Sequence, residues 1–309
     1  MIEAEVIIVG GGPAGAACAG RLCQNGIDCL VLDAQSFPRP KTCAGWVPPE
    51  IFRALQISPA EYPHELTHYR RFSIYIYGMH FTIPTRQYAV RRMEFDHWLL
   101  HRSGAPVETH RVASILREGG RYIIDGTYAC RYLVGAGGTH CPVARTFFPP
   151  REPGRLIVAQ EEEFTYPEAD PDMRAWFFEN DLRGYSWYFP KAGGVVNVGV
   201  GGLAADLKAR GDTLHRHWTL LEEKLDRLEL VRGHTFNPRG ESYYLRADQT
   251  VAQVENAYRI GDAAGLATTD MGEGIRVAVE SGLRAADAIL FHTPYSVKGI
   301  ARYSAKSIL

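Results

Sequence analysis

Six residues near the N-terminus have the types and spacing that bind a phosphate group. Residues 10–15 read GGGPAG and fit the pattern G-x-G-x-x-G. In this pattern the first glycine allows a tight turn, the second lets the backbone approach a pyrophosphate, and the third lets a helix pack closely on a strand. Asp33 stands eighteen residues after Gly15, where a carboxylate can bind ribose hydroxyls. The pattern predicts a dinucleotide site, with the following contacts: Gly10, Gly12, Pro13, Ala14, Gly15, Asp33 and Ala34.

A second glycine cluster lies about 250 residues further along the chain. Residues 259–265 read RIGDAAG, and residues 272–275 read GEGI before a helical pattern. This cluster resembles that of the flavoprotein monooxygenase and geranylgeranyl reductase superfamily, in which the GD motif holds the ribityl chain of FAD. The resemblance implies that FAD is the cofactor and that its contacts include Gly261, Asp262, Ala263, Gly265, Gly272, Gly274 and Ile275. Independently of the family, a helix N-terminus near Gly274 would stabilise an anionic reduced flavin.

Two further segments resemble the same superfamily. Residues 92–99 read RMEFDHWL, which is similar to its R-x-x-[FL]-D-x-x-L helix start, so Arg92 is an expected FAD contact. The alternative is an arginine pair exposed at the start of a helix. Residues 135–138 read GAGG where the superfamily has G-A-D-G, so Gly137 stands in place of an aspartate. In hydroxylases of the para-hydroxybenzoate type that aspartate serves the flavin and the nicotinamide donor, and its absence argues against a hydroxylase-style NADPH site.

The nearest resemblance is to the geranylgeranyl reductase branch. Residues 41–45 read KTCAG, which is similar to its K-x-C-G-G segment beside the flavin ring and implies FAD contacts by Lys41, Cys43, Ala44 and Gly45. Cys43 is expected to be either a proton donor or part of the pocket wall. Residues 185–191 read YSWYFPK and resemble Y-x-W-x-F-P-K, which in the family roofs the substrate cavity.

The alternation of a strand puts Tyr185 and Trp187 on one face of that segment. We therefore expect catalytic or substrate contacts from Cys43, Tyr185 and Trp187. The alternative is a sheet face that is simply buried against the neighbouring domain. No His, Cys and carboxylate set has metal-ligand spacing, and no metal is predicted.

The elements that must position these residues follow from the hydrophobic pattern. Residues 5–9 form a continuous apolar run, residues 14–25 are rich in small helix formers, and residues 29–32 form a second apolar run. This is a βαβ unit with a parallel sheet buried on both faces. Residues 72–83 alternate and can reverse at Gly78, and strand-like runs continue over 155–201, which predicts antiparallel pairing. Helices are expected over 93–103 and 275–290.

The fold class is therefore α/β. We expect a discontinuous Rossmann-like FAD-binding domain built from 1–60, 90–150 and 250–309, with an antiparallel β-sheet substrate domain inserted as 61–89 and 151–249. The chain ends about 35 residues after the start of its last predicted long helix. The family usually continues into a helical region that closes the substrate tunnel, so the cavity is expected to be open or completed by another chain.

Composition narrows the class of protein. The 309 residues carry 34 Lys and Arg against 35 Asp and Glu, a formal net charge of -1, so no general attraction to nucleic acid is expected. No apolar run approaches the ~20 residues of a membrane span, and the N-terminus does not read as a signal peptide. Peripheral contact with a membrane is compatible with this sequence. Six cysteines without a C-x-x-C pair favour the reducing cytoplasm.

The predicted function is an FAD-dependent oxidoreductase that reduces C=C bonds of an apolar, flat or polyprenyl-like substrate by hydride transfer from the reduced flavin. The electrons would come from NAD(P)H that docks transiently or from an electron-donor protein. Two alternatives stay open: an aromatic monooxygenase that uses NAD(P)H and O2, and a flavin-binding protein without catalysis. The sequence does not identify the substrate, the donor or the oligomeric state.

Overall fold

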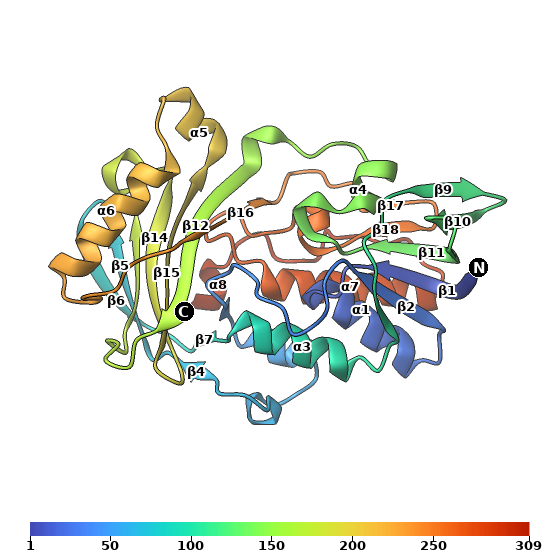
Figure 1. Ribbon diagram of the computed structural model, residues 1–309, viewed down its shortest axis with the longest axis horizontal. Helices are drawn as coiled ribbons and strands as arrows, with labels where there is room; N and C mark the ends of the chain where they lie inside the picture. Colours follow the sequence, from blue (N-terminus) through green and yellow to red (C-terminus); the bar gives the residue numbers. More distant parts are fainter. Residues whose placement is uncertain (309) are drawn as a thin grey trace.

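The computed structural model describes residues 1–308, which form two large sheets that meet along the middle of the molecule (Figure 1). The first sheet has eight strands: β1 (Ile2–Val9), β2 (Cys29–Asp33), β8 (Val107–Thr109), β9 (Ile115–Glu118), β10 (Arg121–Ile124), β11 (Tyr128–Gly135), β17 (Gln253–Val254) and β18 (Ala257–Arg259). Its central order is β17-β18-β11-β1-β2-β8, and the neighbours from β18 to β8 pair in parallel. This is the predicted Rossmann-like sheet.

The apolar runs of the sequence explain that sheet. Strand β2 is buried along its whole length, and Val6, Ile7 and Ile8 of β1 have no exposed surface. Strands that are apolar on both sides must be packed against helices or other elements on both faces of the sheet. Helices α1 (Pro13–Gln24) and α7 (Ile275–Leu290) cover one face, with α3 (Arg92–Arg102) packed beside α1, and α4 (Pro142–Phe147) lies against the other. The predicted helix at 275–290 is confirmed at both ends.

The second sheet has seven strands: β5 (Arg71–Ile76), β6 (Met79–Pro84), β12 (Leu156–Thr165), β13 (Met173–Phe177), β14 (Gly184–Lys191), β15 (Val195–Leu203) and β16 (Arg239–Tyr244). Its order is β16-β12-β15-β14-β13-β5-β6. The predicted hairpin at 72–83 is confirmed as β5 and β6. Strands β5 and β13 pair in parallel, whereas the other neighbouring strands of this sheet pair antiparallel. The two parallel strands belong to separate segments of the chain, which run in the same direction through the sheet.

The two faces of this second sheet have different neighbours. Helix α6 (Leu214–Arg227) packs on the outer face through Trp218 and Leu221, against Val196, Val198 and Val200 of β15. Figure 1 shows α6 on the side away from the first sheet. The inner face packs against Ala44 and Met271, which lie in loops of the first sheet's half of the chain. Alternation along β14 places Tyr185, Trp187 and Phe189 on that inner face, as the sequence predicts.

Short elements complete the chain and join the two sheets. They comprise a three-stranded sheet of β3 (Trp46–Val47), β4 (Thr67–His68) and β7 (Tyr88–Ala89), and helices α2 (Glu50–Ala54), α5 (Ala204–Ala209) and α8 (Ala305–Ile308). Single 3₁₀ turns lie at Pro59–Glu61, Gly138–His140, Pro153–Arg155, Glu179–Asp181 and Gly261–Ala264. Across the described residues, every helix is too short or too polar to cross a lipid bilayer.

Candidate active site

The first glycine cluster forms the turn between β1 and α1. Gly10 has a φ of +113°, and a Cβ atom there would lie 2.4 Å from the Ala136 carbonyl oxygen. A Cβ atom at Gly15 would lie 1.9 Å from the Gly10 carbonyl oxygen. Packing inside the chain therefore requires glycine at both positions, in agreement with the roles of the first and third glycines of the pattern.

At Gly12, neither the backbone conformation nor packing within the chain requires a glycine. Its φ and ψ are -69° and -177°, which any residue adopts, and the nearest atom to a built Cβ is Arg39 Nη2 at 3.8 Å. Neither strain nor crowding in this chain excludes a side chain there. Gly12 is also the N-cap of α1 and provides no side-chain cap, so the helix end is left for another acceptor. Both features fit a bound pyrophosphate.

Asp33 stands at the carboxyl end of β2, beside the turn. Its Oδ2 accepts the Gly11 N–H at 2.7 Å and its Oδ1 accepts the Gln35 N–H at 3.0 Å. The carboxylate therefore also stabilises the glycine turn, a role that the sequence reasoning did not predict. An ionised carboxylate has further lone pairs, so these two bonds are compatible with ribose hydroxyls as additional donors. Ala34 follows it on the exposed surface.

The second glycine cluster meets the first. A Cβ atom at Gly261 would lie 3.0 Å from the Cβ of Ala14, and one at Gly282 would lie 2.1 Å from the Ala14 carbonyl oxygen. Helices α1 and α7 are packed this closely because small residues line their contact. Two glycine clusters that are about 250 residues apart in the sequence thus lie side by side in the fold.

The N-terminus of α7 is similar to that of α1, except that the Glu273 carboxylate accepts the Arg276 N–H at 2.8 Å. Gly261, Gly265 and Gly272 have φ values of +56°, +66° and +64°, so the loop before α7 requires glycine there. Gly274 does not: its φ is -119°, and a Cβ would stand 3.6 Å from Asp262 Oδ1 in ordinary contact. As the N-cap of α7 it offers no side-chain cap. Ala263 is buried behind the loop and Ile275 within the first turn of the helix.

Asp262 lies between the two helix ends. Among the described residues its carboxylate oxygens accept no hydrogen bond, and only its backbone oxygen does, from Arg151. Burial raises the pKa of this carboxyl, while the charges of Lys41 and Arg92 act in the opposite direction. A carboxylate in such a position is an acceptor for hydroxyl donors of a ligand. Together with the helix ends, it fits the ribityl chain and phosphates of FAD.

Arg92 is buried, and its charge acts on Asp262. Its guanidinium makes two bonds of 2.8 Å each to Asp96, one turn further along α3. The alternative interpretation, an exposed arginine pair, is wrong for Arg92 because helix α3 packs this face inward; Arg91 is the partly exposed member. The charge of Asp96 raises the pKa of Arg92 against the effect of burial. The structure thus brings Arg92 to the site.

The loop 41–45 lies between the helix ends and the second sheet. Gly45 has a φ of +70°, and a Cβ there would collide with the Val90 carbonyl oxygen at 2.1 Å. Cys43 is half-buried, and its Sγ accepts the Gly45 N–H at 3.4 Å. Lys41 forms an ion pair with Glu241 of β16, and Ala44 packs against the aromatic cluster of the sheet. The loop thereby contacts both parts of the molecule.

Gly137 lies at the other side of the first turn. A Cβ at Gly10 would lie 2.7 Å from the Gly137 N, so the two glycines are adjacent. A Cβ at Gly137 itself would lie 3.3 Å from the Cα of Cys141, a tight contact. Gly137 itself is exposed. The family's aspartate is absent at this position, and the chain packs closely against Cys141 there instead.

The aromatic residues of β14 use their polar atoms inside the protein. Tyr185 donates its hydroxyl to the Met271 carbonyl oxygen at 2.6 Å, and Trp187 donates its Nε1 to Asn197 Oδ1 at 2.7 Å. The Trp187 ring lies over Gly199, where a Cβ would be only 2.1 Å from the ring. Both residues therefore belong to a packed apolar wall on the inner face of the second sheet.

Sequence reasoning missed three residues of this site. Glu161 is 6% exposed and lies on the inner face of β12. Its signal was present in the alternation of Ile157, Ala159 and Glu161, which places all three on one face. Arg151 was also missed: its Nη1 donates to the Ala263 carbonyl oxygen at 2.7 Å and so fixes the loop of Asp262. Tyr243 is the third, and a Cβ at Gly272 would lie 2.4 Å from its hydroxyl oxygen.

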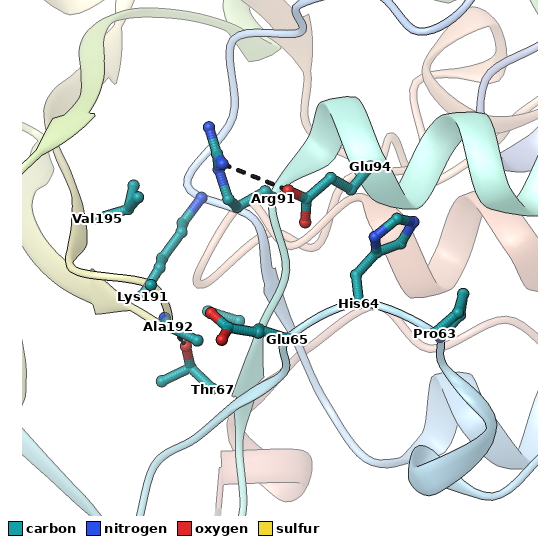
Figure 2. Close-up of a pocket in the computed structure, with 11 residues that line it drawn as sticks. Pro63, His64, Glu65, Thr67, Arg91, Glu94, Lys191, Ala192 and Val195 are labelled. Carbon is teal, nitrogen blue, oxygen red and sulfur yellow. Dashed lines mark hydrogen bonds and ion pairs between the residues drawn. The ribbon is translucent and has the colours of Figure 1, made fainter.

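A polar pocket of about 310 Å³ lies between the segment 63–67, the start of α3 and the turn after β14 (Figure 2). It is lined by Arg91 and Glu94 from the start of α3, by His64 and Glu65, and by Lys191 at the end of β14. Figure 2 shows the Lys191 ammonium group directed toward Arg91. Both cations bind the carboxylate of Glu163, at 2.6 Å from Lys191 and 3.0 Å from Arg91. The two cations of this pocket, Arg91 and Lys191, are therefore paired within the protein.

Comparisons with known proteins agree with this geometry. Residues 3–57 match the family model described as FAD binding domain. The chain is 27% identical over 304 residues to digeranylgeranylglycerophospholipid reductase 2 of Methanopyrus kandleri, covering 91% of this chain and 75% of the relative. It is 28% identical over 324 residues to menaquinone reductase of Mycobacterium tuberculosis, covering 93% and 76%.

Solved structures share the fold. A geranylgeranyl bacteriochlorophyll reductase-like protein of Thermoplasma acidophilum superposes with a TM-score of 0.81 at 20% identity, covering 95% of this chain and 81% of that one. A flavin-dependent brominase superposes with a TM-score of 0.75 at 18% identity, covering 97% and 81%. Residues 3–57 are thus similar to an FAD-binding domain, and over nearly its whole length the chain resembles proteins named geranylgeranyl reductase-like and digeranylgeranylglycerophospholipid reductase.

Proposed function

We propose that this protein is an FAD-dependent reductase of C=C bonds in an apolar, polyprenyl-like substrate. The observation that carries the proposal is the aromatic inner face of the second sheet. It packs against both cofactor loops, through Ala44 of the loop 41–45 and Met271 of the loop before α7. An apolar wall next to a flavin suits a substrate without charged groups at the reacting bond. The reductase names of the relatives support the same reaction class.

Each part of the site would contact a different part of the cofactor or of the substrate. The N-terminus of α1 and Gly12 would hold the pyrophosphate, Asp33 the adenosine ribose, and Asp262 with Arg92 the ribityl and phosphate oxygens. The N-terminus of α7 would face the edge of the flavin ring that becomes negative on reduction. When bound, FAD supplies the hydride for the substrate carbon. The sheet residues Tyr185 and Trp187 would exclude water and orient the apolar chain.

We further propose that residues 1–60, 90–150 and 250–309 form the cofactor domain, and that 61–89 and 151–249 form the substrate domain. The electrons would come from NAD(P)H docking transiently or from a donor protein. Peripheral membrane contact would give access to a lipid-like substrate. The cytoplasmic location stays a prediction from the cysteine content.

The test uses the purified protein loaded with FAD and reduced without oxygen by NADPH or by dithionite. Geranylgeranyl diphosphate and menaquinone serve as probe substrates because relatives carry these names. We expect product masses that increase by two hydrogens for each reduced bond. Oxygen-dependent gain of one oxygen atom on an aromatic probe would indicate the monooxygenase instead. A flavin that no donor reduces would indicate a flavin-binding protein without catalysis.

A further inference from the structure

One buried acid of the site has no role in the proposed cofactor binding. Glu161 lies in the middle of β12, opposite Gly199 of β15 and Arg239 of β16. Its neighbour on the same face, Ala159, belongs to the aromatic cluster that contains Trp187 and Met271. Glu161 therefore interrupts an otherwise apolar wall with a carboxyl group, and burial of such a group is costly unless it has partners.

The partners of Glu161 come from several elements. The Cys43 backbone N–H and the side chain of Asn197, whose buried Nδ2 has no other hydrogen-bond partner among the described residues, favour the charged form of the carboxyl, and the ammonium groups of Lys191 and Lys41 act on it as positive charges. Lys191 is 1% exposed at its side chain and is shared with Glu163. The titratable groups near Glu161 are Lys41, Cys43, Tyr185, Lys191 and Tyr243, together with Glu163 on the same face of β12 and Arg239 opposite on β16. Three of these residues, Lys41, Cys43 and Tyr185, are also expected site residues.

We propose that Glu161 is the proton donor of the site, which protonates the substrate carbon directly or through Cys43. This inference rests on the proposed reductase function. In the reaction the π bond breaks, one carbon receives a hydride from the reduced flavin, and the other receives the proton. The substrate gains two electrons, the flavin loses two, and Glu161 is left as a carboxylate. The reductant that restores the flavin is NADPH or dithionite, and water restores the proton.

The surroundings suit a carboxyl that must hold and then release a proton. Burial raises the pKa of Glu161 to about 7, and Lys191 is the largest of the influences that limit this rise. A donor with a pKa near the working pH is protonated in part and still acidic enough to transfer its proton. After transfer, the Lys191 ammonium stabilises the carboxylate, and the amide groups of Cys43 and Asn197 favour the charged form.

The first experiment observes the proton itself. Infrared spectra of the FAD-loaded and the FAD-free protein are recorded between pH 5 and pH 9, and the stretch of a protonated buried carboxyl is followed. We expect a band that disappears near neutral pH in the wild type and is absent from Glu161→Gln. The matched control is Glu162→Gln, one position along β12 on the opposite face, where the carboxylate contacts His234. That variant should keep the band.

The second experiment mixes the reduced protein with geranylgeranyl diphosphate or menaquinone in a single turnover. In Glu161→Gln we expect unchanged FAD content and unchanged flavin reduction by dithionite, but at least ~100-fold slower transfer to the alkene, the usual effect of losing a general acid. In the wild type the rate should fall as the pH rises above neutrality, and this dependence should be flat in the variant. Glu162→Gln should behave as the wild type.

The outcomes separate the two proposals. A wild type that reduces the alkene while Glu161→Gln is equally fast would overturn the role of Glu161 and leave the reductase function in place. A missing carboxyl band in the wild type would also overturn it. A titrating band at Glu161 in a protein that reduces no alkene would overturn the reductase function and retain Glu161 as the proton-holding group of the site.

Discussion

Gly12 and Gly274 are the residues at which the structure argues most strongly for a ligand. Both are N-caps that carry no capping side chain of their own, and both have negative φ values that other residues adopt readily. Neither is crowded by the chain itself. At α7 one of the first N–H groups, that of Arg276, is already bonded by the Glu273 side chain. The other glycines of the two clusters are explained by positive φ or by close packing, so their identity says little about the cofactor. Sequence alone cannot make this distinction, because the pattern G-x-G-x-x-G contains both kinds.

Gly12→Val should therefore remove FAD without unfolding the protein. The side chain fits the backbone conformation and meets only the Arg39 side chain, but it occupies the space in front of the helix end. We expect at least ~100-fold weaker FAD binding by fluorescence titration, a loss of about 3 kcal/mol, and an FAD-free Tm close to that of the wild type. Gly15→Ala is the contrasting variant, since its Cβ meets backbone at 1.9 Å. It should lower the FAD-free Tm. Full flavin content in Gly12→Val would refute the assignment of this turn.

Asp262→Asn should affect the FAD-free protein and the loaded protein in opposite directions. The pKa of Asp262 is higher in the folded protein than its unfolded value of 3.8. At any pH above 3.8, the charged carboxylate therefore lowers the stability of the folded protein. The cost grows as the pH rises toward the folded pKa and is then constant, at about 1.4 kcal/mol for each unit of the shift. The FAD-free variant should be more stable than the wild type at pH 7 and equal to it near pH 3.

The same substitution removes an anionic acceptor from the FAD site, and we expect roughly tenfold weaker FAD binding. Lys41 and Arg92 keep their partners Glu241 and Asp96, so the variant leaves no unpaired cation. Thermal unfolding of the FAD-free protein at the two pH values, with a fluorescence titration of FAD, checks both effects. Unchanged FAD affinity would show that Asp262 does not contact the cofactor.

At the scale of the elements, hydrophobic period and glycine spacing predicted most of the framework. They placed the βαβ unit, the hairpin at 72–83 and the helix at 275–290, because each pattern is local. They could not predict that β5 and β13 pair in parallel, because register between distant segments depends on the whole sheet. They also missed Glu161, Arg151 and Tyr243, which reach the site only because β12, β16 and the segment at 151 fold back onto the cofactor loops.

A substitution in the aromatic wall of β14 should lower the rate of turnover and the stability of the protein but leave FAD binding unchanged. Trp187→Ala removes the ring that covers Gly199 and leaves Asn197 without its donor, so we expect about 3–5 kcal/mol lower stability. FAD content should be unchanged, and the rate of alkene reduction should fall at least ~10-fold. The control is Trp218→Ala on α6, which is also buried but packs on the outer face.

That control variant should lose similar stability and keep the wild-type rate for each molecule of bound FAD. Denaturant unfolding, flavin absorbance and single-turnover rates distinguish the two variants. Loss of FAD in Trp187→Ala alone would place this tryptophan against the cofactor rather than against the substrate.

At the scale of the whole molecule, function depends on the junction of two sheets. The proposed cofactor elements come from both ends of the chain, and the loop 41–45 and the loop before α7 connect them to the inner face of the second sheet. The fold is shared with reductases and with a halogenating flavoprotein. The reaction is therefore decided by the groups at this junction and not by the fold.

The most direct test of the reductase is a double-mixing experiment without oxygen. The FAD-loaded protein is reduced by one equivalent of NADPH or dithionite and then mixed with geranylgeranyl diphosphate or menaquinone, while the visible absorbance of oxidised flavin is followed. We predict that the alkene alone restores this absorbance and that the product gains two hydrogens. Restoration that needs oxygen, with no reduced product, would contradict the proposed reductase function.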